Sequence, residues 1–176
     1  FLSVGYTSWV ENTTKSSVLY IPSWSMFLKA VSVDYFTISG LKEYNSSGGE
    51  IGSLNYNDTA VTFNIGAKLY IIDLGLNLKI ISEKISSYSG NGYGLDAGLI
   101  FPFSKQIKIG VSYLNSGTFK LKVDEEKIKI DLPQTLRAGV SYQKENFLFD
   151  IDWERADSES ILHFGGEIKF QDKYFI

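Results

Sequence analysis

The sequence predicts an all-β protein, built as an antiparallel, up-and-down transmembrane β-barrel. Three observations predict this fold class: apolar residues recur at every second position over most of the 176 residues, the links between these segments alternate in length, and the polar face mixes charge with glycine. An aromatic content of 15%, with only 3 prolines beside 16 glycines, also favours strands over helices. We therefore expect about eleven strands and no helix.

The expected strands follow one another along the whole chain. Each clear one places apolar side chains on one face and polar or small side chains on the other, which is the period of an extended strand. Weak alternation covers 2–10, 16–21 and 25–38, clear alternation covers 61–69, 74–80, 93–101, 107–113, 136–142, 147–154 and 162–170, and a last strand starts at 173–176. Segments of this length match what a tilted strand needs to cross a bilayer.

The links between these strands alternate between short and long. Short links are expected at 22–23, 71–73, 102–105, 143–145 and 171–172, and long ones at 41–58, 86–92, 115–134 and 155–160. Inside the third long link, 119–123 and 128–132 alternate around Asp124-Glu125-Glu126, which predicts a projecting hairpin with a solvated tip. Short turns at one rim and long loops at the other are typical of outer-membrane barrels.

Composition limits the classes of function. A hydrophobic fraction of 44% suffices for one domain over 1–176, and a net charge of −3 lacks the basic field that nucleic-acid binding needs. There is no cysteine, which excludes disulfides, thiolate nucleophiles and cysteine metal sites.

The polar face separates a membrane barrel from a soluble protein, because a soluble antiparallel barrel or sandwich acting as a binding module would give the same alternation. Here glycines lie among mixed charges, which suits a crowded wet interior whose charges pair across strands. We expect a lumen-facing charged network of Lys68, Lys79, Asp96, Lys108, Arg137, Asp150, Asp152, Glu154, His163, Glu167 and Lys169. Within it, the predicted turn at 143–145 brings Arg137 close to Asp150 and Asp152.

Several stretches together resemble the PorV/PorQ-like outer-membrane proteins, which are similar to the FadL-type channels for hydrophobic compounds. The stretches are Gly94–Leu99, Ile109–Ser112 with Asn115–Gly117, Leu132–Pro133 with Thr135–Tyr142, Phe149–Asp152 and His163–Glu167. The resemblance implies a location in the bacterial outer membrane, with the lipid bilayer as partner. It implies either passage of small hydrophobic molecules or a role in secretion and assembly, in which exported proteins are received at the cell surface.

The residues do not predict an enzyme, a cofactor or a metal site. His163 is the single histidine and falls on the polar phase of its strand, so a paired structural role is favoured over catalysis. Asp150, Asp152 and Glu154 have a spacing that suits Ca²⁺ or acid–base chemistry, but pairing with cations on other strands is the favoured reading. Gly90–Gly94 lacks a following helix, so it is not expected to be a phosphate-binding loop, and Ser86–Gly92 is expected to form a flexible outer loop.

We also expect the chain to be most of a longer barrel with further closing strands, and the resemblance implies a plugging N-terminal segment. An odd number of strands is unusual in bacterial barrels, and open sheet edges in hydrocarbon leave backbone groups unpaired.

Overall fold

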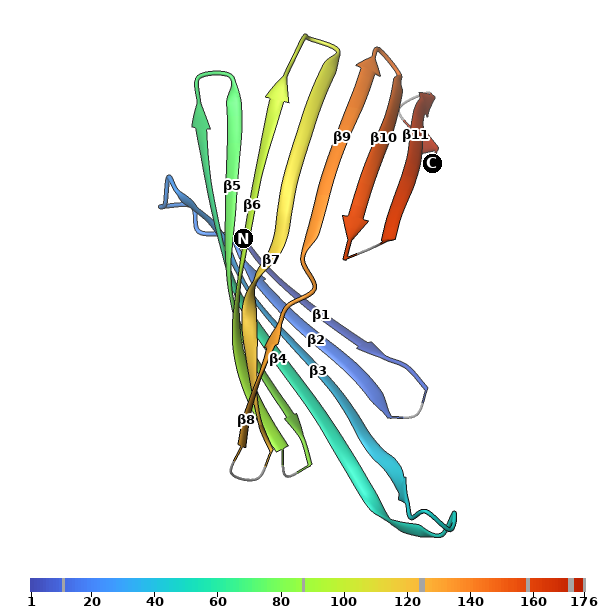
Figure 1. Cartoon of the computed structure of the whole chain (residues 1–176). Coiled ribbons are helices and arrows are strands. Elements are labelled where there is room, and N and C mark those ends of the chain that lie inside the picture. Colours follow the sequence, from blue (N-terminus) through green and yellow to red (C-terminus); the bar gives the residue numbers. More distant parts are fainter. Residues whose placement is uncertain (11, 87, 124–125, 158, 171–172, 176) are drawn as a thin grey trace. The chain divides into compact units, whose positions relative to one another are not determined.

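The chain folds into antiparallel strands without a helix in the residues that the structure describes. The computed structural model describes residues 1–10, 12–86, 88–123, 126–157, 159–170 and 173–175 (Figure 1). The strands are β1 (Leu2–Ser8), β2 (Thr13–Tyr20), β3 (Leu28–Tyr44), β4 (Glu50–Leu69), β5 (Ile72–Ile85), β6 (Tyr88–Pro102), β7 (Ile107–Val123), β8 (Glu126–Asp131), β9 (Thr135–Lys144), β10 (Phe147–Ala156), β11 (Glu159–Phe170) and β12 (Lys173–Phe175). Across these ranges, no helix has the length and apolarity needed to cross a membrane.

The strands pair in chain order, as the up-and-down prediction requires. The sheet runs β1-β2-β3-β4-β5-β6-β7-β9-β10-β11-β12, and β8 pairs with the far end of β7. This order confirms the all-β antiparallel meander. In the described residues it ends at β1 and β12, which are not paired with each other.

The chain divides into two compact units, and each contains parts of the longer strands. The first unit comprises Phe1–Ile65, Asn77–Gly94 and Gly117–Leu132, and the second comprises Gly66–Leu76, Leu95–Ser116 and Pro133–Ile176.

In the first unit, cross-strand register aligns one apolar face over β1 to β4. Val4, Val18, Val33 and Val61 form one row of directly opposed residues. The neighbouring row on the opposite face is Gly5, Ser17, Asp34 and Ala60. Directly opposed residues share a face, so the alternation seen in each strand is shared by the sheet.

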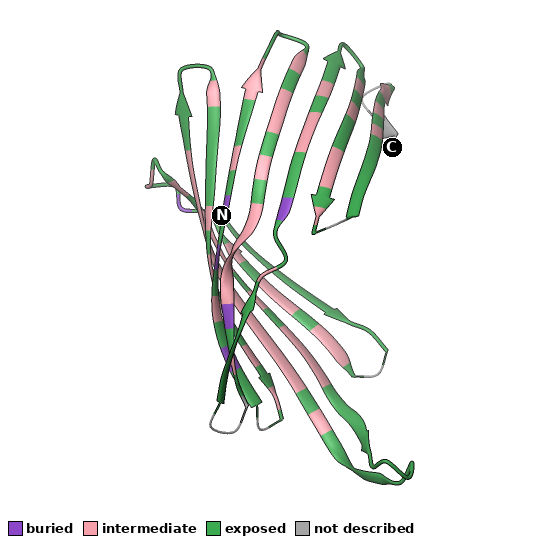
Figure 2. Ribbon diagram, viewed as in Figure 1, coloured by how far each residue is buried: buried purple, intermediate pink, exposed green. Residues whose placement is uncertain are grey.

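The second unit repeats this two-faced arrangement over β7, β9, β10 and β11. One row consists of Ile109, Val140, Ile151 and Phe164, and the adjacent row on the other face consists of Gly110, Gly139, Asp152 and His163. The apolar row is open: Val140 is 47% exposed and Phe164 is 67% exposed. Figure 2 shows how little of the sheet is buried.

The structure contains almost no apolar core. Among the described residues, only Phe119, at 7% exposure, and Pro22 are buried residues with apolar side chains, and no side chain is completely buried. The Phe119 ring fills the space that side chains at Gly90 and Gly92 would occupy on β6. These two glycines therefore form a slot for Phe119.

All four links expected to be long loops are largely strand, and in the last of them β10 runs to Ala156 and β11 begins at Glu159. β3 and β4 continue to a turn at 45–49, β6 begins at Tyr88, and β7 runs unbroken to Val123 before the predicted hairpin with β8. Sequence alternation did not join these extensions to the neighbouring strands, because polar residues and glycines interrupt the apolar pattern there. The expectation of a flexible outer loop at Ser86–Gly92 was wrong for Tyr88–Gly92, since these residues begin β6. Of the predicted tip, residues 124–125 lie outside the described residues, and Glu126 begins β8.

β7 changes phase at Asn115. This residue has φ +60°, and the strand reverses which side chains face each side of the sheet: Ser112 lies beside Gly98 before it, and Phe119 lies against Gly90 after it. Nearby, Gly117 passes so close to the Tyr93 carbonyl that a Cβ atom would overlap it. A residue in the left-handed region followed by a tightly packed glycine is typical of a β-bulge.

We predict that Gly117→Ala lowers the free energy of unfolding by about 1–3 kcal/mol, because the methyl group meets rigid backbone. Gly75→Ala is the matched control, since no atom lies within 4 Å of a Cβ built there. It should leave stability unchanged or raise it slightly. Urea unfolding of both variants measures the difference, and equal midpoints would contradict the close approach.

Candidate functional site

The polar face of the second unit brings together three of the predicted residues. Arg137 Nη2 lies 2.9 Å from Glu154 Oε2, and His163 Nε2 lies 3.5 Å from the same oxygen. The Glu154 side chain is 18% exposed, whereas its two partners are about half exposed. Glu154 is therefore the centre of a three-residue cluster that joins β9, β10 and β11.

The expected partner of Arg137 was wrong, because the observed pairing is shifted by two residues from the expected one. Arg137 is opposite Glu154, and Asp152 is opposite Gly139. The turn consists of Glu145 and Asn146, later than the predicted 143–145, with Glu145 at φ +50°. Moving the centre of the turn shifts the pairing by two residues and keeps the faces, so a carboxylate still meets Arg137.

Asp152 and Asp150 lie over glycines on neighbouring strands. A Cβ at Gly139 would overlap Asp152 Oδ1, and a Cβ at Gly165 would lie 2.6 Å from Asp150 Oδ2. The glycines among the charges thus provide room for the carboxylates.

Asp96 supports the β7 bulge. Its carboxylate accepts a hydrogen bond of 2.8 Å from the Asn115 backbone N–H, and the residue is only 5% exposed. Asn115 also donates through its side chain to the Pro133 carbonyl at 3.1 Å. Asp96 therefore has a structural contact that its assignment to a charged network did not include.

The other predicted network residues are spread over the polar face. Lys68 pairs with Asp73 at 3.4 Å across the turn at Tyr70, and Lys79 lies beside Gly94. The remaining positions are Lys108 opposite Ser141, Glu167 opposite Leu148, and Lys169 opposite Tyr174 in backbone register. The proposed lumen role of the eleven residues stays a prediction.

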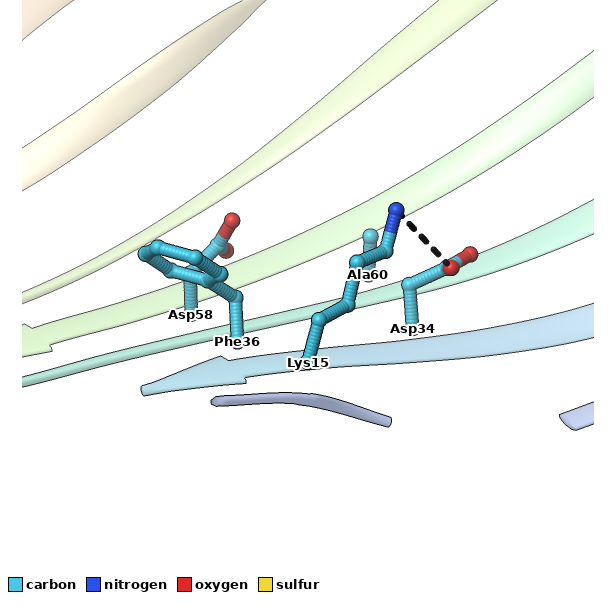
Figure 3. Close-up of a pocket in the computed structure, with 5 residues that line it drawn as sticks. All are labelled: Lys15, Asp34, Phe36, Asp58 and Ala60. Atoms are coloured by element: carbon cyan, nitrogen blue, oxygen red, sulfur yellow. Dashed lines mark ion pairs between the residues drawn. The ribbon is translucent and has the colours of Figure 1, made fainter. Parts of the chain in front are cut away.

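The first unit holds a pocket of about 250 Å³ that sequence reasoning missed. It is lined by Lys15, Asp34, Phe36, Asp58 and Ala60, which project from one face of the sheet (Figure 3). Lys15 Nζ and Asp34 Oδ1 are 3.9 Å apart. The only sequence signal was the two-residue spacing of Asp34 with Phe36 and of Asp58 with Ala60, and the register that unites β2, β3 and β4 was not predictable from it.

Beside this pocket is a group of three acids: Asp58, Glu83 and Tyr56. All three lie outside the alternating segments 61–69 and 74–80 that the sequence assigns to the membrane. Asp58 Oδ1 is buried and, within the described part of the chain, has no hydrogen-bond partner. The Tyr56 hydroxyl donates to the Glu83 carboxylate, and the Tyr56 ring meets Phe36 edge to face at a centroid distance of 6.0 Å.

Burial is the main reason why the pKa of each of the three groups is raised. For Asp58 the backbone N–H of Thr59 opposes this rise in pKa. For Glu83 the nearby Asp58 charge raises the pKa further, and the Tyr56 hydroxyl opposes it. The Tyr56 pKa is raised by burial and then by the Glu83 and Asp58 charges.

The pocket offers both apolar and charged contacts. No set of three or more His, Cys, Asp or Glu residues suited to a metal ion occurs among the residues that the structure describes. An aromatic ring, two pocket carboxylates and one ammonium group instead provide both apolar and charged contacts.

No protein-family model, curated protein or solved structure matches this chain.

We predict that Asp58→Asn increases the free energy of unfolding at pH 7 by less than about 1 kcal/mol, because much of the group is open to screening water. A raised native pKa means that the folded state binds the proton more tightly than the unfolded state. Stability therefore rises as the pH falls from neutral through the native pKa, towards the ordinary carboxyl value of about 4.

The variant should show a smaller rise in stability over this pH range than the parent protein. Urea unfolding at several pH values measures it, with Glu43→Gln on exposed β3 as the control. Parallel pH profiles for the parent and Asp58→Asn would show that folding does not raise the pKa of Asp58.

Proposed function

We propose that this chain is an integral membrane protein of the bacterial outer membrane, folded as a β-barrel of the PorV/FadL-like type. The single observation that carries the proposal is the open apolar face, aligned row by row over β7, β9, β10 and β11. Large apolar patches are rare on soluble monomers. In a bilayer the same face is covered by lipid, and paired strands satisfy the backbone.

The opposite face supports the same proposal. It carries the Arg137–Glu154–His163 cluster and the carboxylates packed over Gly139 and Gly165. A soluble barrel or sandwich would enclose its apolar face and expose this polar one. A membrane barrel does the reverse, with polar residues around its lumen.

Of the two roles that the resemblance implies, the pocket favours passage of small molecules over a scaffold for exported proteins. The pocket lies on the polar face of the first unit, since Asp34 and Ala60 belong to the row of Gly5 and Ser17. Phe36 gives it an apolar wall, so amphiphilic molecules are the ligands that fit its chemistry.

The membrane proposal predicts opposite outcomes for arginine at two adjacent positions. Val140→Arg, on the apolar face, should lower the free energy of unfolding from phosphatidylcholine vesicles by about 2–4 kcal/mol. Ser141→Arg, on the polar face and opposite Asp150, should cost far less. Urea unfolding from vesicles measures both variants. Equal costs, or a parent chain that stays outside the vesicles, would favour a soluble protein.

The passage role predicts that filling the pocket slows solute entry. Ala60→Trp should reduce the swelling rate of vesicles in benzyltrimethylammonium chloride towards that of protein-free vesicles, because the indole occupies the pocket. Ala97→Trp adds the same group at an exposed position on the apolar face of β6 and should behave like the parent protein. Equal rates for the parent and Ala60→Trp would favour the scaffold role.

A further inference from the structure

The hairpin of β7 and β8 places four lysines on one face. Lys120 is directly opposite Lys129, and Lys122 is directly opposite Lys127. All four are exposed, and we call this set the lysine face. Its residues are Lys120, Lys122, Lys127 and Lys129.

Two directly opposed pairs of like charge destabilise an isolated hairpin. The described carboxylates only partly offset this, since Asp131 Oδ1 is 4.0 Å from Lys129 Nζ and Glu126 belongs to the other face. A sheet surface that concentrates positive charge in this way is complementary to an anion.

The lysine face lies on the side of the β7–β8 hairpin that faces away from Phe119. Phe119 covers the side of β6 that Gly90 and Gly92 leave open, so Lys120, the next residue, faces the other side. On β6 that side carries Tyr93, which is 63% exposed.

The position of the lysines along β7 sets how far they lie beyond the hydrocarbon layer of the proposed membrane. A tilted strand crosses the hydrocarbon in about 9–11 residues, so β7 leaves it near residue 116 when counted from Ile107. Lys120 follows roughly 13 Å further along the strand, at about 3.3 Å per residue. A lysine side chain at this height extends into the headgroup layer.

We propose that the lysine face binds the phosphate groups of anionic lipid headgroups. This inference rests on the proposed membrane function. It accounts for the opposed lysines, because headgroup phosphates neutralise charges that would otherwise repel one another. Basic residues close to an anionic membrane surface each strengthen binding by a similar increment.

The test is a titration of the whole chain, folded in neutral dodecyl maltoside micelles, with dihexanoyl phosphatidic acid. Isothermal calorimetry should show much weaker binding of dihexanoyl phosphatidylcholine. Lys120→Gln with Lys122→Gln should weaken phosphatidic acid binding about 25-fold, which is about fivefold for each charge.

The control removes two other exposed lysines of the first unit. Lys29 donates to the Met26 carbonyl at 2.7 Å and Lys42 pairs with Glu50 at 2.8 Å, so both already have partners. Lys29→Gln with Lys42→Gln should retain the affinity of the parent protein. Equal losses in the two double variants would overturn the inference in favour of general charge attraction.

Two further arms separate the remaining outcomes. If inorganic phosphate binds as tightly as phosphatidic acid, the lysine face is a free-phosphate site and the headgroup proposal is wrong. Insertion of the parent into neutral phosphatidylcholine vesicles tests the membrane function separately. Insertion without a preference for phosphatidic acid overturns only the lysine-face proposal, and failure to insert overturns both.

Discussion

Pairing between strands, and not a packed interior, holds this chain together. Every strand from β1 to β12 has its hydrogen bonds with a neighbour, whereas Phe119 and Pro22 are the only buried residues with apolar side chains among the described residues. Backbone pairing adds little net free energy in water, where both partners can bond to solvent. It becomes decisive where water is absent, because an unpaired group then has no alternative. The stability of such a sheet depends on the medium around its apolar face.

The polar face provides both space and charged partners for its carboxylates. Asp152 and Asp150 fold over Gly139 and Gly165, and Glu154 takes both Arg137 and His163. Glycine weakens an isolated strand, but here it lets a carboxylate lie flat against the neighbouring backbone. The glycines and the carboxylates therefore depend on each other, because a larger residue in place of the glycine would displace the carboxylate.

Periodicity predicted the all-β meander because each clear strand alternates over at least seven residues. It also placed Arg137 and Glu154 on one face. The register was less predictable, since a turn moved to Glu145 and Asn146 changes every partner while preserving the pattern. The pocket of Lys15, Phe36 and Asp58 was missed because β2, β3 and the first half of β4 alternate weakly. Their pairing depends on neighbouring strands, which single-strand periodicity does not contain.

The reversal at Asn115 makes the outer part of β7 a separable module. Before it, odd-numbered residues such as Ile109 share the apolar face; after it, even-numbered residues such as Lys120 face away from Phe119. Lengthening the β7–β8 hairpin by residue pairs, one on each strand, beyond this point leaves the inner half of the strand unchanged. Loss of the bulge residue would instead exchange the two faces of the hairpin. Phe119 would then face away from Gly90 and Gly92, and the lysines would face towards them. The hairpin can thus tolerate changes in length, provided that residues are added or removed as pairs, so that each side chain keeps its face of the sheet.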